Sequence, residues 1–547
     1  MDKNTLLFLE TRTNELNDHI ALGMKSYLGW RELSYKGLGI LARRLGGYLV
    51  KYGIEKGDKV AILSESMPEW GAALFASTIS GAISVPLDIK LTIYELTSIL
   101  SDCQPKIMLV SSAFLETALK IRESVTSIEQ IVVIDGHGEN TEFPCLYKLK
   151  DTEDVKWRHR NLLKSALIIY TSGTTGMPKG VEITFKNVFA QMEGIGKAFK
   201  FGRRDKFLSI LPMNHLFELT FGFLTLLNKG SSVYYSKSLK PKDIFPILQE
   251  KQITFMIVVP AFLKLLQTAI EAEVKQGGKF KQFMFDFRYS LAKMIEYRWV
   301  KKLLFKKIHK LMGGKFRGFV SGGAPLDVKN GKFFETIGIR IFEGYGLSEA
   351  SPVVSVNTEK AHKLGSVGKP LSNVQVKVDK ETGELQVKGA NVMKGYFNRP
   401  EMTADVITEE GWLKTGDIAK IDNDGFIWIT GRIKNMIVLS GGKKVFPEEV
   451  EAVLSKSPLI QELCVFGQKK QNGQKEGTEN VCVRVVPKQK TIEQYSDDAQ
   501  LEIAIKAEIK TLSNRLSHFK RPTTVIVTKE PLPRNALNKV KRKEVTL

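Results

Sequence analysis

The sequence predicts an α/β protein: a large, multilayered N-terminal domain with two mostly parallel sheets and a small β module, then a small α+β C-terminal domain. Three observations lead to this fold class. The chain has 547 residues, which is too long for one ordinary hydrophobic core. Between about residues 60 and 350, short β-rich runs alternate with longer helical patterns, as in parallel sheets covered by helices. After Lys360, short strands and turns rich in Gly or Asn replace this alternation.

The strands predicted in the large domain are nearly continuous apolar runs, as expected where helices cover both faces of a sheet. These runs are residues 60–63, 106–110, 131–134, 166–170, 207–211 and 253–259. The β module is predicted from residues 374–378, 383–387 and 423–429.

The small domain is predicted to begin near residues 431–435, which gives one domain at 1–431 and a second at 432–547. Its first helix starts at Pro447-Glu448-Glu449, because proline is harmless in a first turn and the helix dipole favours acidic residues there. Further strands are predicted at residues 463–466, 481–486 and 525–527, and a helix at 501–516.

Composition excludes some classes of protein and leaves several partners open. With 43% hydrophobic and 26% charged residues, the chain is neither largely disordered nor fibrous. The 81 Lys and Arg residues outnumber the 59 Asp and Glu residues, for a net charge of +22. This excess suggests an acidic partner, which could be nucleic acid, an anionic bilayer, nucleotide substrates or an acidic protein.

The cysteines and the apolar runs indicate a cytoplasmic protein. Four widely spaced cysteines form no C-x-x-C pair, so disulfide frameworks and zinc fingers are not expected and a reducing cytosol fits. The N-terminal residues carry no secretory signal. A membrane-spanning helix needs about 20 apolar residues. The longest runs, 219–227 and 253–266, are too short or are interrupted by Pro260 and Lys264.

The densest chemical signal is the string 170–180, Tyr-Thr-Ser-Gly-Thr-Thr-Gly-Met-Pro-Lys-Gly, directly after an apolar run. Small residues let backbone N–H groups approach an anion, hydroxyls donate further hydrogen bonds, and Lys179 adds a cation, which together suit a polyphosphate. The string is not a Walker A loop, because Pro178 and Gly180 flank the lysine. A plain flexible loop is the alternative for a shorter match.

With this string the chain resembles the adenylate-forming superfamily of acyl-CoA synthetases, luciferases and peptide-synthetase adenylation domains. Further motifs of that superfamily occur in the same order over most of the chain. They are Leu-Pro-Met-Asn-His (211–215), Ser-Gly-Gly-Ala-Pro-Leu (321–326), Gly-Tyr-Gly-Leu-Ser-Glu (344–349), Trp-Leu-Lys-Thr-Gly-Asp (412–417), Gly-Arg-Ile-Lys (431–434) and Pro-Arg-Asn-Ala-Leu-Asn-Lys (533–539). Seven motifs in register are far more specific than any one of them.

The resemblance implies that a carboxylate attacks the α-phosphate of ATP to form an acyl adenylate, whose AMP then leaves readily. It implies catalytic roles for Lys539 at the α-phosphate, for Lys179, and for His215 near the acyl carboxylate. It implies that Glu349 is the Mg²⁺ ligand, since a hard cation takes carboxylate oxygen. The implied ATP-binding residues are Thr171, Ser172, Gly173, Thr174, Thr175, Gly176, Lys179, Gly323, Ala324, Pro325, Tyr345, Gly346, Ser348, Asp417 and Arg432.

Within this set, Tyr345 would stack on adenine and Asp417 would accept hydrogen bonds from the ribose hydroxyls. Each residue also has a simpler interpretation. Asp417 fits an ordinary turn, His215 a hydrogen-bonded core histidine and Tyr345 core packing, while Lys539 lies in a basic tail that could be solvated. Two positions depart from the family pattern: Ser348 replaces the more frequent Thr, and Asn538 replaces the Gly before the tail lysine.

The resemblance also implies that the C-terminal domain is mobile and swings after adenylation. Lys434 matches the hinge position. The rotation would withdraw Lys539 and present Ser440, Gly441 and Gly442 to the thiol substrate, although Gly-Gly followed by Lys is also typical of a hairpin turn.

Residues 288–317 carry ten Lys and Arg residues against one acidic residue, Glu296. Apolar residues recur at intervals near three and four, which predicts a basic amphipathic helix able to lie on an anionic membrane. A helix packed on the main domain with a solvated basic face is the alternative. Long-chain fatty acyl-CoA synthetases resemble this chain in the segment 299–326 and again at 431–451.

The sequence therefore predicts an ATP- and Mg²⁺-dependent ligase that joins a long-chain fatty acid to CoA, with possible contact with the inner face of an anionic membrane. The first alternative is ligation to acyl carrier protein, because a basic surface suits that acidic protein equally well. The second is a non-catalytic protein that uses its basic face, for example for nucleic acid. No nucleic-acid motif is recognised, so no nucleic-acid partner is expected.

Overall fold

The computed structural model describes residues 7–26, 29–136, 142–150, 161–171, 178–439, 443–469, 479–495, 497–534 and 540–545. The chain divides into two compact units. Unit 1 comprises Met1–Val376, Val387–Leu413 and Asn423–Ile427. Unit 2 comprises Lys377–Gln386, Lys414–Asp422 and Trp428–Leu547.

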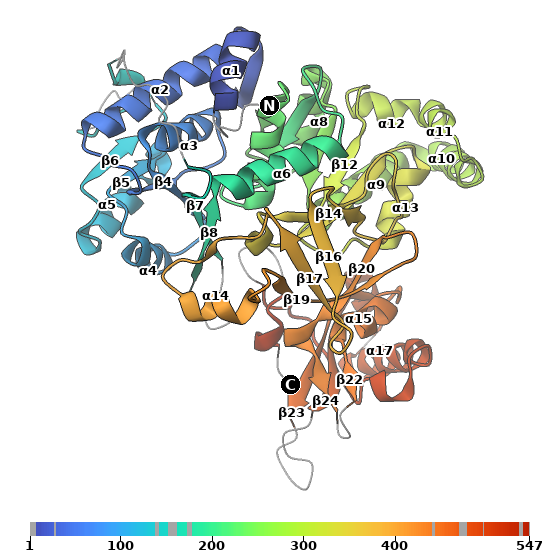
Figure 1. Cartoon of the computed structure of the whole chain (residues 1–547). Helices are drawn as coiled ribbons and strands as arrows, with labels where there is room; N and C mark the ends of the chain where they lie inside the picture. Colours follow the sequence, from blue (N-terminus) through green and yellow to red (C-terminus); the bar gives the residue numbers. More distant parts are fainter. Residues whose placement is uncertain are drawn as a thin grey trace. The chain divides into compact units, whose positions relative to one another are not determined.

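Seven strands of unit 1 form one sheet, in the order β18, β8, β7, β4, β3, β5, β6 (Figure 1). Their bounds are Lys59–Leu63 (β3), Ile83–Pro86 (β4), Ile107–Val110 (β5), Gln130–Val133 (β6), Ser165–Thr171 (β7), Lys179–Thr184 (β8) and Gly395–Tyr396 (β18). The five strands β7, β4, β3, β5 and β6 run parallel, whereas β8 and β18 are antiparallel to their neighbours.

Nine strands form the second sheet of unit 1, in the order β15, β14, β13, β12, β11, β9, β10, β1, β2. Their bounds are Ile20–Ser26 (β1), Gly29–Ser34 (β2), Lys206–Ser209 (β9), Ser232–Tyr235 (β10), Phe255–Val258 (β11), Gly318–Ser321 (β12), Arg340–Gly346 (β13), Val353–Val356 (β14) and Lys369–Pro370 (β15). Strands β13 to β1 run parallel, and the edge strands are antiparallel.

The helices of unit 1 cover both faces of both sheets. They are α1 (Leu7–Leu16), α2 (Tyr35–Lys51), α3 (Pro68–Ser80), α4 (Ile93–Cys103), α5 (Leu115–Ser124), α6 (Phe185–Ala198), α7 (Leu226–Asn228), α8 (Pro241–Lys251), α9 (Pro260–Gln276), α10 (Gly278–Lys293), α11 (Arg298–Leu304), α12 (Lys306–Leu311), α13 (Val328–Thr336) and α14 (Pro400–Val406). Figure 1 shows α6 between the two sheets. It begins after Thr184, whose hydroxyl accepts a hydrogen bond from the backbone N–H of Asn187, an N-cap.

Alternate residues of the central strands enter different hydrophobic cores. In β3, Val60 and Ile62 join a core with α2, α3 and α6, whereas Ala61 and Leu63 join a core with α4 and α5. In the second sheet, Phe255 faces the shared core and Met256 packs with α8 and α9. Strands buried on both faces explain the continuous apolar runs in the sequence.

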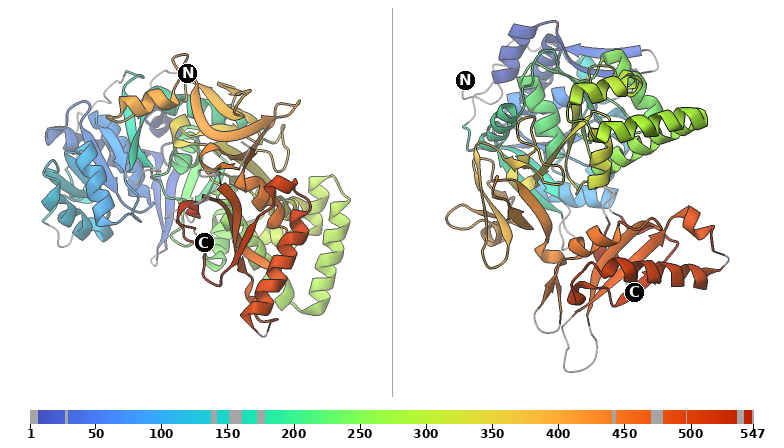
Figure 2. Two further views of the ribbon diagram at one scale, coloured as in Figure 1. Left: turned by 90° about the horizontal axis from the view of Figure 1, so that it is seen from below. Right: turned by 90° about the vertical axis from the view of Figure 1, so that its right-hand side faces the viewer.

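A four-stranded sheet forms the β module, and its residues are divided between the two units. Its strands are β16 (Val374–Val378), β17 (Glu384–Gly389), β19 (Leu413–Ile421) and β20 (Ile427–Arg432). Unit 2 adds β21 (Ile437–Val438), β22 (Lys444–Val445), β23 (Ile460–Lys469), β24 (Glu479–Pro487) and β25 (Thr524–Val527), with helices α15 (Pro447–Leu454), α16 (Gln489–Ile492) and α17 (Asp498–Ser513). Figure 2 shows α17, in red, alongside the sheet of unit 2, where Ile505 and Val483 share one core.

The predicted α/β class and the two mostly parallel sheets are confirmed. Each of the six apolar runs overlaps a strand, and residues 374–378 coincide with β16. The predicted strand at 423–429 starts too early, because Gly425 adopts φ +83° in a turn before β20. The four cysteines are free and buried. Among the described residues, no helix is both long and apolar enough to cross a membrane.

Candidate active site

The β7–β8 hairpin places Thr171 and Lys179 opposite each other on antiparallel strands. A Cβ at Gly180 would lie 2.8 Å from Ile168 Cγ2 and 3.2 Å from Phe397 Cβ, so only glycine fits at this position. The hairpin therefore holds both ends of the predicted phosphate-binding string. The remaining predicted residues of the string lie outside the described residues: Ser172, Gly173, Thr174, Thr175 and Gly176.

Glu349, the predicted magnesium ligand, lies in a short 3₁₀ helix, Ser348–Ala350, after β13. Its Oε1 accepts a hydrogen bond of 2.8 Å from the hydroxyl of Tyr396. Tyr396 reaches it because β18 pairs with β8, where Tyr396 lies opposite Val181. Nζ of Lys179, also on β8, lies 5.4 Å from the centre of the Tyr396 ring. One aromatic side chain thus brings the predicted metal ligand and the predicted phosphate-binding lysine together.

The Tyr396 hydroxyl is a hydrogen-bond donor at neutral pH. Burial, and after it the negative charge of Glu349, raise the pKa of this hydroxyl. A carboxylate can only accept hydrogen bonds, so a permanent donor fixes one Glu349 oxygen and leaves the other for a cation.

Two buried amides fix the turn that follows Glu349. Nε2 of Gln191 on α6 donates to the carbonyl oxygens of Ala350 (3.1 Å) and Val353 (2.8 Å), and its Oε1 accepts from the Val353 N–H. Nδ2 of Asn391 donates to the same Ala350 oxygen at 3.1 Å. The backbone N–H of Met393 donates to the Glu349 carbonyl at 2.8 Å. The Glu349 segment is therefore held by backbone and side-chain contacts on two sides.

The loop 321–326 follows β12 and carries the predicted adenine-binding residues. Gly323 has φ +80°, a left-handed conformation that favours glycine, and it is exposed together with Ala324 and Pro325. The backbone N–H of Leu326 donates to Oε1 of buried Glu343 at 3.3 Å, which ties the loop to β13. Burial raises the pKa of Glu343 to about 7.

The neighbouring β13 end presents the other predicted nucleotide residues of unit 1. Tyr345 is half-buried against the shared core, and Ser348 begins the 3₁₀ helix. A Cβ at Gly346 would lie 2.0 Å from the carbonyl oxygen of Pro352, so this position admits glycine alone. The carboxyl ends of β12 and β13 are adjacent, because these strands pair in parallel.

His215 lies in the segment between β9 and a π-helix at Phe217–Thr225. Ser66, which follows β3 of the other sheet, anchors this segment: its hydroxyl donates to Leu211 O (3.3 Å) and accepts from Met213 N (3.1 Å). One hydroxyl thus links the carboxyl ends of the two sheets. In the π-helix, Glu218 is fully buried, and burial raises its pKa to about 8.

Asp417 and Arg432 form a contact within unit 2. The Asp417 side chain is buried, and its Oδ1 accepts a hydrogen bond of 2.6 Å from Nε of Arg432, whose side chain is largely exposed. The predicted ribose ligand and its predicted neighbour are therefore in direct contact. Lys434, the predicted hinge residue, is exposed in a 3₁₀ turn, Ile433–Asn435.

The predicted catalytic lysine of the tail, Lys539, and the residues predicted to face the thiol substrate, Ser440, Gly441 and Gly442, lie outside the described residues. Around the tail, Arg534 and Val540 form an antiparallel bridge. Arg542 is not part of a solvated basic run. Its guanidinium contacts Glu448 Oε1 at 2.8 Å and Glu451 Oε1 at 2.6 Å on α15, which fastens the tail to unit 2.

The prediction of one amphipathic helix in the basic segment 288–317 is wrong. The segment comprises the end of α10, then α11 and α12, with buried Phe305 at the break between the last two. Met312 is buried, but Trp299 and Leu303 are 64% and 63% exposed. The apolar residues therefore do not lie on one face of one helix.

Two family profiles match the chain. The profile described as AMP-binding enzyme matches residues 9–397, and the AMP-binding enzyme C-terminal domain profile matches residues 434–546. The chain belongs to the AMP-binding enzyme family. This membership confirms the resemblance to adenylate-forming enzymes and identifies the chain as an adenylate-forming ligase.

Curated relatives of this family member act on different acids. The Mycobacterium bovis long-chain-fatty-acid–CoA ligase FadD15 is 30% identical over 79% of the chain and 74% of its own length. The Arabidopsis thaliana long-chain-fatty-acid–[acyl-carrier-protein] ligase AEE15 is 28% identical over 76% of the chain and 68% of its length. The malonate–CoA ligase of the same plant is 26% identical over 90% of the chain and 78% of its length.

Solved structures of the family share the fold over nearly the whole chain. An ATP-bound RpMatB-BxBclM chimera has a TM-score of 0.80 and 27% identity, with 99% of this chain and 98% of the other covered. The Bacillus subtilis O-succinylbenzoate coenzyme A synthetase in complex with ATP and a magnesium ion has a TM-score of 0.76 and 25% identity, with 98% of each chain covered.

Sequence reasoning missed four side chains that position the site: Tyr396, Gln191, Glu343 and Arg542. None of them lies in a motif with a chemical signature of its own. Tyr396 lies 47 residues from its partner Glu349, and Gln191 lies 162 residues from its partner Val353. Only the pairing of strands and the packing of helices reveal these contacts. For Arg542, two glutamates one turn apart at the start of a predicted helix were the available signal.

Proposed function

We propose that the chain uses ATP and Mg²⁺ to activate a long-chain fatty acid and then transfers the acyl group to CoA. In the first step, a carboxylate oxygen of the acid attacks the α-phosphate of ATP, forming acyl-AMP and releasing pyrophosphate. In the second, the thiol sulfur attacks the acyl carbon, forming the thioester and releasing AMP and the thiol proton. AMP is a far better leaving group than the oxide of a free carboxylate, so the first step makes the second possible.

The arrangement of Glu349, Tyr396 and Lys179 carries this proposal. A carboxylate with one oxygen fixed by a permanent donor suits Mg²⁺, which usually takes one or two protein carboxylates and completes its shell with phosphates and water. Glu349 would hold the ion, and the ion would neutralise charge on the triphosphate. Lys179 would contact the β- and γ-phosphates with Thr171 and the small residues 172–176.

Three further regions are assigned to adenine, to the ribose and to the acyl carboxylate. Exposed backbone at Gly323–Pro325 and the ring of Tyr345 would contact adenine. Asp417 would accept hydrogen bonds from the ribose hydroxyls, with Arg432 holding its other oxygen. His215 would lie near the acyl carboxylate, on the segment that Ser66 anchors.

Lys539 would reach the α-phosphate and the carboxylate oxygens during adenylation. We further propose domains at 1–431 and 432–547, with Lys434 as the hinge of a rotation that brings the Ser440–Gly442 loop to the thiol. A 3₁₀ turn with an exposed lysine at its centre can change φ and ψ without disturbing a core.

Long-chain fatty acid and CoA are favoured by the FadD15 relative and by the likeness of residues 299–326 and 431–451 to the long-chain subgroup. Acyl carrier protein is the second candidate acceptor, favoured by the AEE15 relative and by the net charge of +22. A peripheral contact with an anionic membrane is proposed through the basic helices α10–α12. Lys302 contributes less to it than Lys306 or Lys307, because Lys302 is half-buried whereas the other two are exposed.

The test is fatty-acid-dependent exchange of labelled pyrophosphate into ATP, measured over a series of chain lengths. Exchange with long-chain acids and dependence on Mg²⁺ are expected, followed by thioester formation with CoA. Exchange only with short or dicarboxylic acids would reject the proposed substrate, and product only with carrier protein would establish the second candidate. No exchange with any acid would support a non-catalytic protein.

A further inference from the structure

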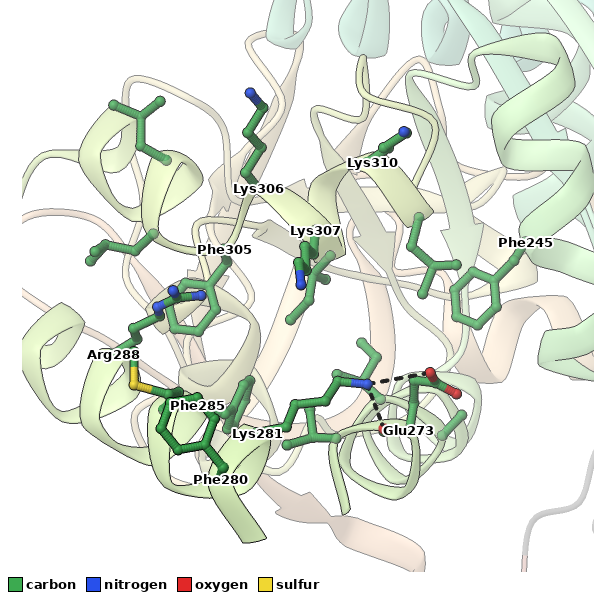
Figure 3. A pocket seen from close by; sticks show the side chains of 18 of the residues that line it. Phe245, Glu273, Phe280, Lys281, Phe285, Arg288, Phe305, Lys306, Lys307 and Lys310 are labelled. Carbon is green, nitrogen blue, oxygen red and sulfur yellow. Dashed lines mark hydrogen bonds and ion pairs between the residues drawn. The ribbon is translucent and has the colours of Figure 1, made fainter. Parts of the chain in front are cut away.

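A large pocket lies among α8, α9, α10, α11 and α12 of unit 1 (Figure 3). Its volume is about 1390 Å³, which exceeds the ~300–1,000 Å³ of common small-molecule pockets. None of its lining residues belongs to the motifs of the candidate active site. Only its lining residues from Arg288 onward belong to the segment in which a basic amphipathic helix is predicted.

The interior of the pocket is apolar. Phe285 of α10 and buried Phe305, between α11 and α12, meet edge to face with ring centres 5.6 Å apart. Ile270 on α9 is buried beside them in the core that extends to the second sheet. Phe280 and Leu303 also line the pocket but are 77% and 63% exposed, so its apolar surface continues to the outside. Such a lining suits a hydrocarbon chain.

Cationic side chains surround this apolar interior. Six Lys and Arg residues line the pocket against one acid, Glu273, which pairs with Lys281 at 3.6 Å (Figure 3). The other five cations form no ion pair with any residue that the structure describes: Lys242, Arg288, Lys306, Lys307 and Lys310. Unpaired cations beside an apolar interior favour an anionic head group.

The pocket is separate from the candidate active site within unit 1. The active-site loops follow the carboxyl ends of β12 and β13, and α9 starts at Pro260 after the neighbouring strand β11. The pocket uses residues 269–274 of α9. At a rise of about 1.5 Å per residue, Val274 lies roughly 20 Å along the helix from Pro260.

We propose that this pocket binds a single-chain lipid with an anionic head group, its chain between α9 and α12 and its head group against the lysines of α12. A free fatty acid, a fatty acyl-CoA and a lysophospholipid share this chemistry. The inference goes beyond the proposed ligase activity, because it rests only on the lining of a second site.

The test is photocrosslinking of the full chain with palmitate that carries a diazirine on its alkyl chain, followed by mass spectrometry of the peptides. Adducts are expected within residues 269–285 and 300–311. Ala269→Trp places a bulky indole in the pocket lining and should reduce these adducts at least fivefold, and Lys306→Glu/Lys307→Glu/Lys310→Glu should do the same. Adducts absent from both segments, or unchanged in both variants, would overturn the proposal.

A matched control reverses three lysines of α9 and α10 that do not line the pocket: Lys275→Glu/Lys279→Glu/Lys293→Glu. This control should leave the adducts unchanged. If it loses as many adducts as the pocket variants, the loss comes from the change in net charge, and the site is rejected. Palmitate, palmitoyl-CoA and lysophosphatidate are then tested as unlabelled competitors. The one that binds most tightly identifies the head group. Hexadecanol competing as well as all three would overturn the anionic specificity.

Pyrophosphate exchange is measured on every variant. These assays contain no membrane, so the proposed membrane contact does not affect them. Because the pocket variants leave the active-site residues intact, exchange should persist in them, which also shows that they fold. Exchange without pocket adducts refutes this inference alone, whereas adducts without exchange refute the proposed ligase alone.

Discussion

The hydroxyl of Tyr396 donates a 2.8 Å hydrogen bond to Glu349, 47 residues earlier in the chain. The same ring lies 5.4 Å from the ammonium group of Lys179. Neither contact is visible in the sequence, and both follow from the pairing of a two-residue strand with β8. This relationship leads to the first prediction.

Tyr396→Phe should lower pyrophosphate exchange about tenfold and raise the Mg²⁺ concentration needed for half-maximal exchange. It keeps the ring but removes the donor to Glu349, and a hydrogen bond to a charged group contributes about 1.5–3 kcal/mol. Exchange rates over a Mg²⁺ titration measure the effect. Tyr52→Phe, which removes an exposed hydroxyl, is the control. A lower rate with an unchanged Mg²⁺ requirement would contradict the proposed role of Glu349.

Glu218→Gln should remove a pH dependence of stability. Burial raises the pKa of native Glu218 to about 8, against 4.5 as its ordinary value. The native state therefore holds a proton that the unfolded state releases, so this contribution is complete below pH 4.5 and is lost as the pH rises through 8. Thermal unfolding of both proteins should agree near pH 4, and the variant should be several degrees more stable at pH 9. Parallel profiles of the two proteins would show that Glu218 is not the titrating group.

Arg542→Ala should destabilise unit 2 by a few kcal/mol, because it leaves Glu448 and Glu451 without their shared guanidinium. Arg542→Lys should give an intermediate loss, since an ammonium group cannot reproduce the two-pronged contact. Urea unfolding and the rate of adenylation are the measurements. Equal stability of all three proteins would mean that the tail is held by other contacts.

Lys434→Pro should slow thioester formation more than adenylation, because proline fixes φ at the proposed hinge. Lys434→Ala removes the side chain but leaves the backbone free, so it should change both steps little. Rapid-quench measurements of acyl-AMP and thioester formation separate the two steps. If Pro and Ala slow both steps equally, residue 434 is not the hinge.

Lys539→Ala should reduce adenylation by at least a hundredfold and leave thiolysis of supplied acyl-AMP largely intact. The lysine is proposed to neutralise negative charge that grows on the α-phosphate during adenylation. Supplied acyl-AMP has already passed this step, so its thiolysis should not need the lysine. The two half-reactions are assayed separately. A parallel loss of both would reject the role assigned to Lys539.

The strands of unit 1 could be predicted from the sequence because burial on both faces leaves a continuous apolar run, as in β3 and β5. The division of the basic segment among the end of α10, α11 and α12 could not, since the break at Phe305 depends on this residue entering a core built by α8, α9 and α10. The π-helix at Phe217–Thr225 has no sequence signature either, although it carries buried Glu218.

The candidate site likewise contains some residues that the sequence predicts and others that it does not. Motifs predicted Glu349, Asp417 and Arg432, and the last two are in contact. The supporting residues Tyr396, Gln191 and Glu343 depend on strand pairing and helix packing, which a single sequence does not reveal. The residues predicted to carry the chemistry lie in short sequence motifs. The residues that orient them lie far away in the sequence and meet them only in the folded chain.

The buried amide of Gln191 spans the turn after Glu349 from inside unit 1. Every contact described for Glu349 and the turn after it, through Tyr396, Met393 and this amide, comes from the same unit. The proposed magnesium ligand is consequently positioned by unit 1. Under the proposed function, replacing the C-terminal region with that of another family member would exchange the residues proposed to bind the thiol and leave the proposed cation site intact.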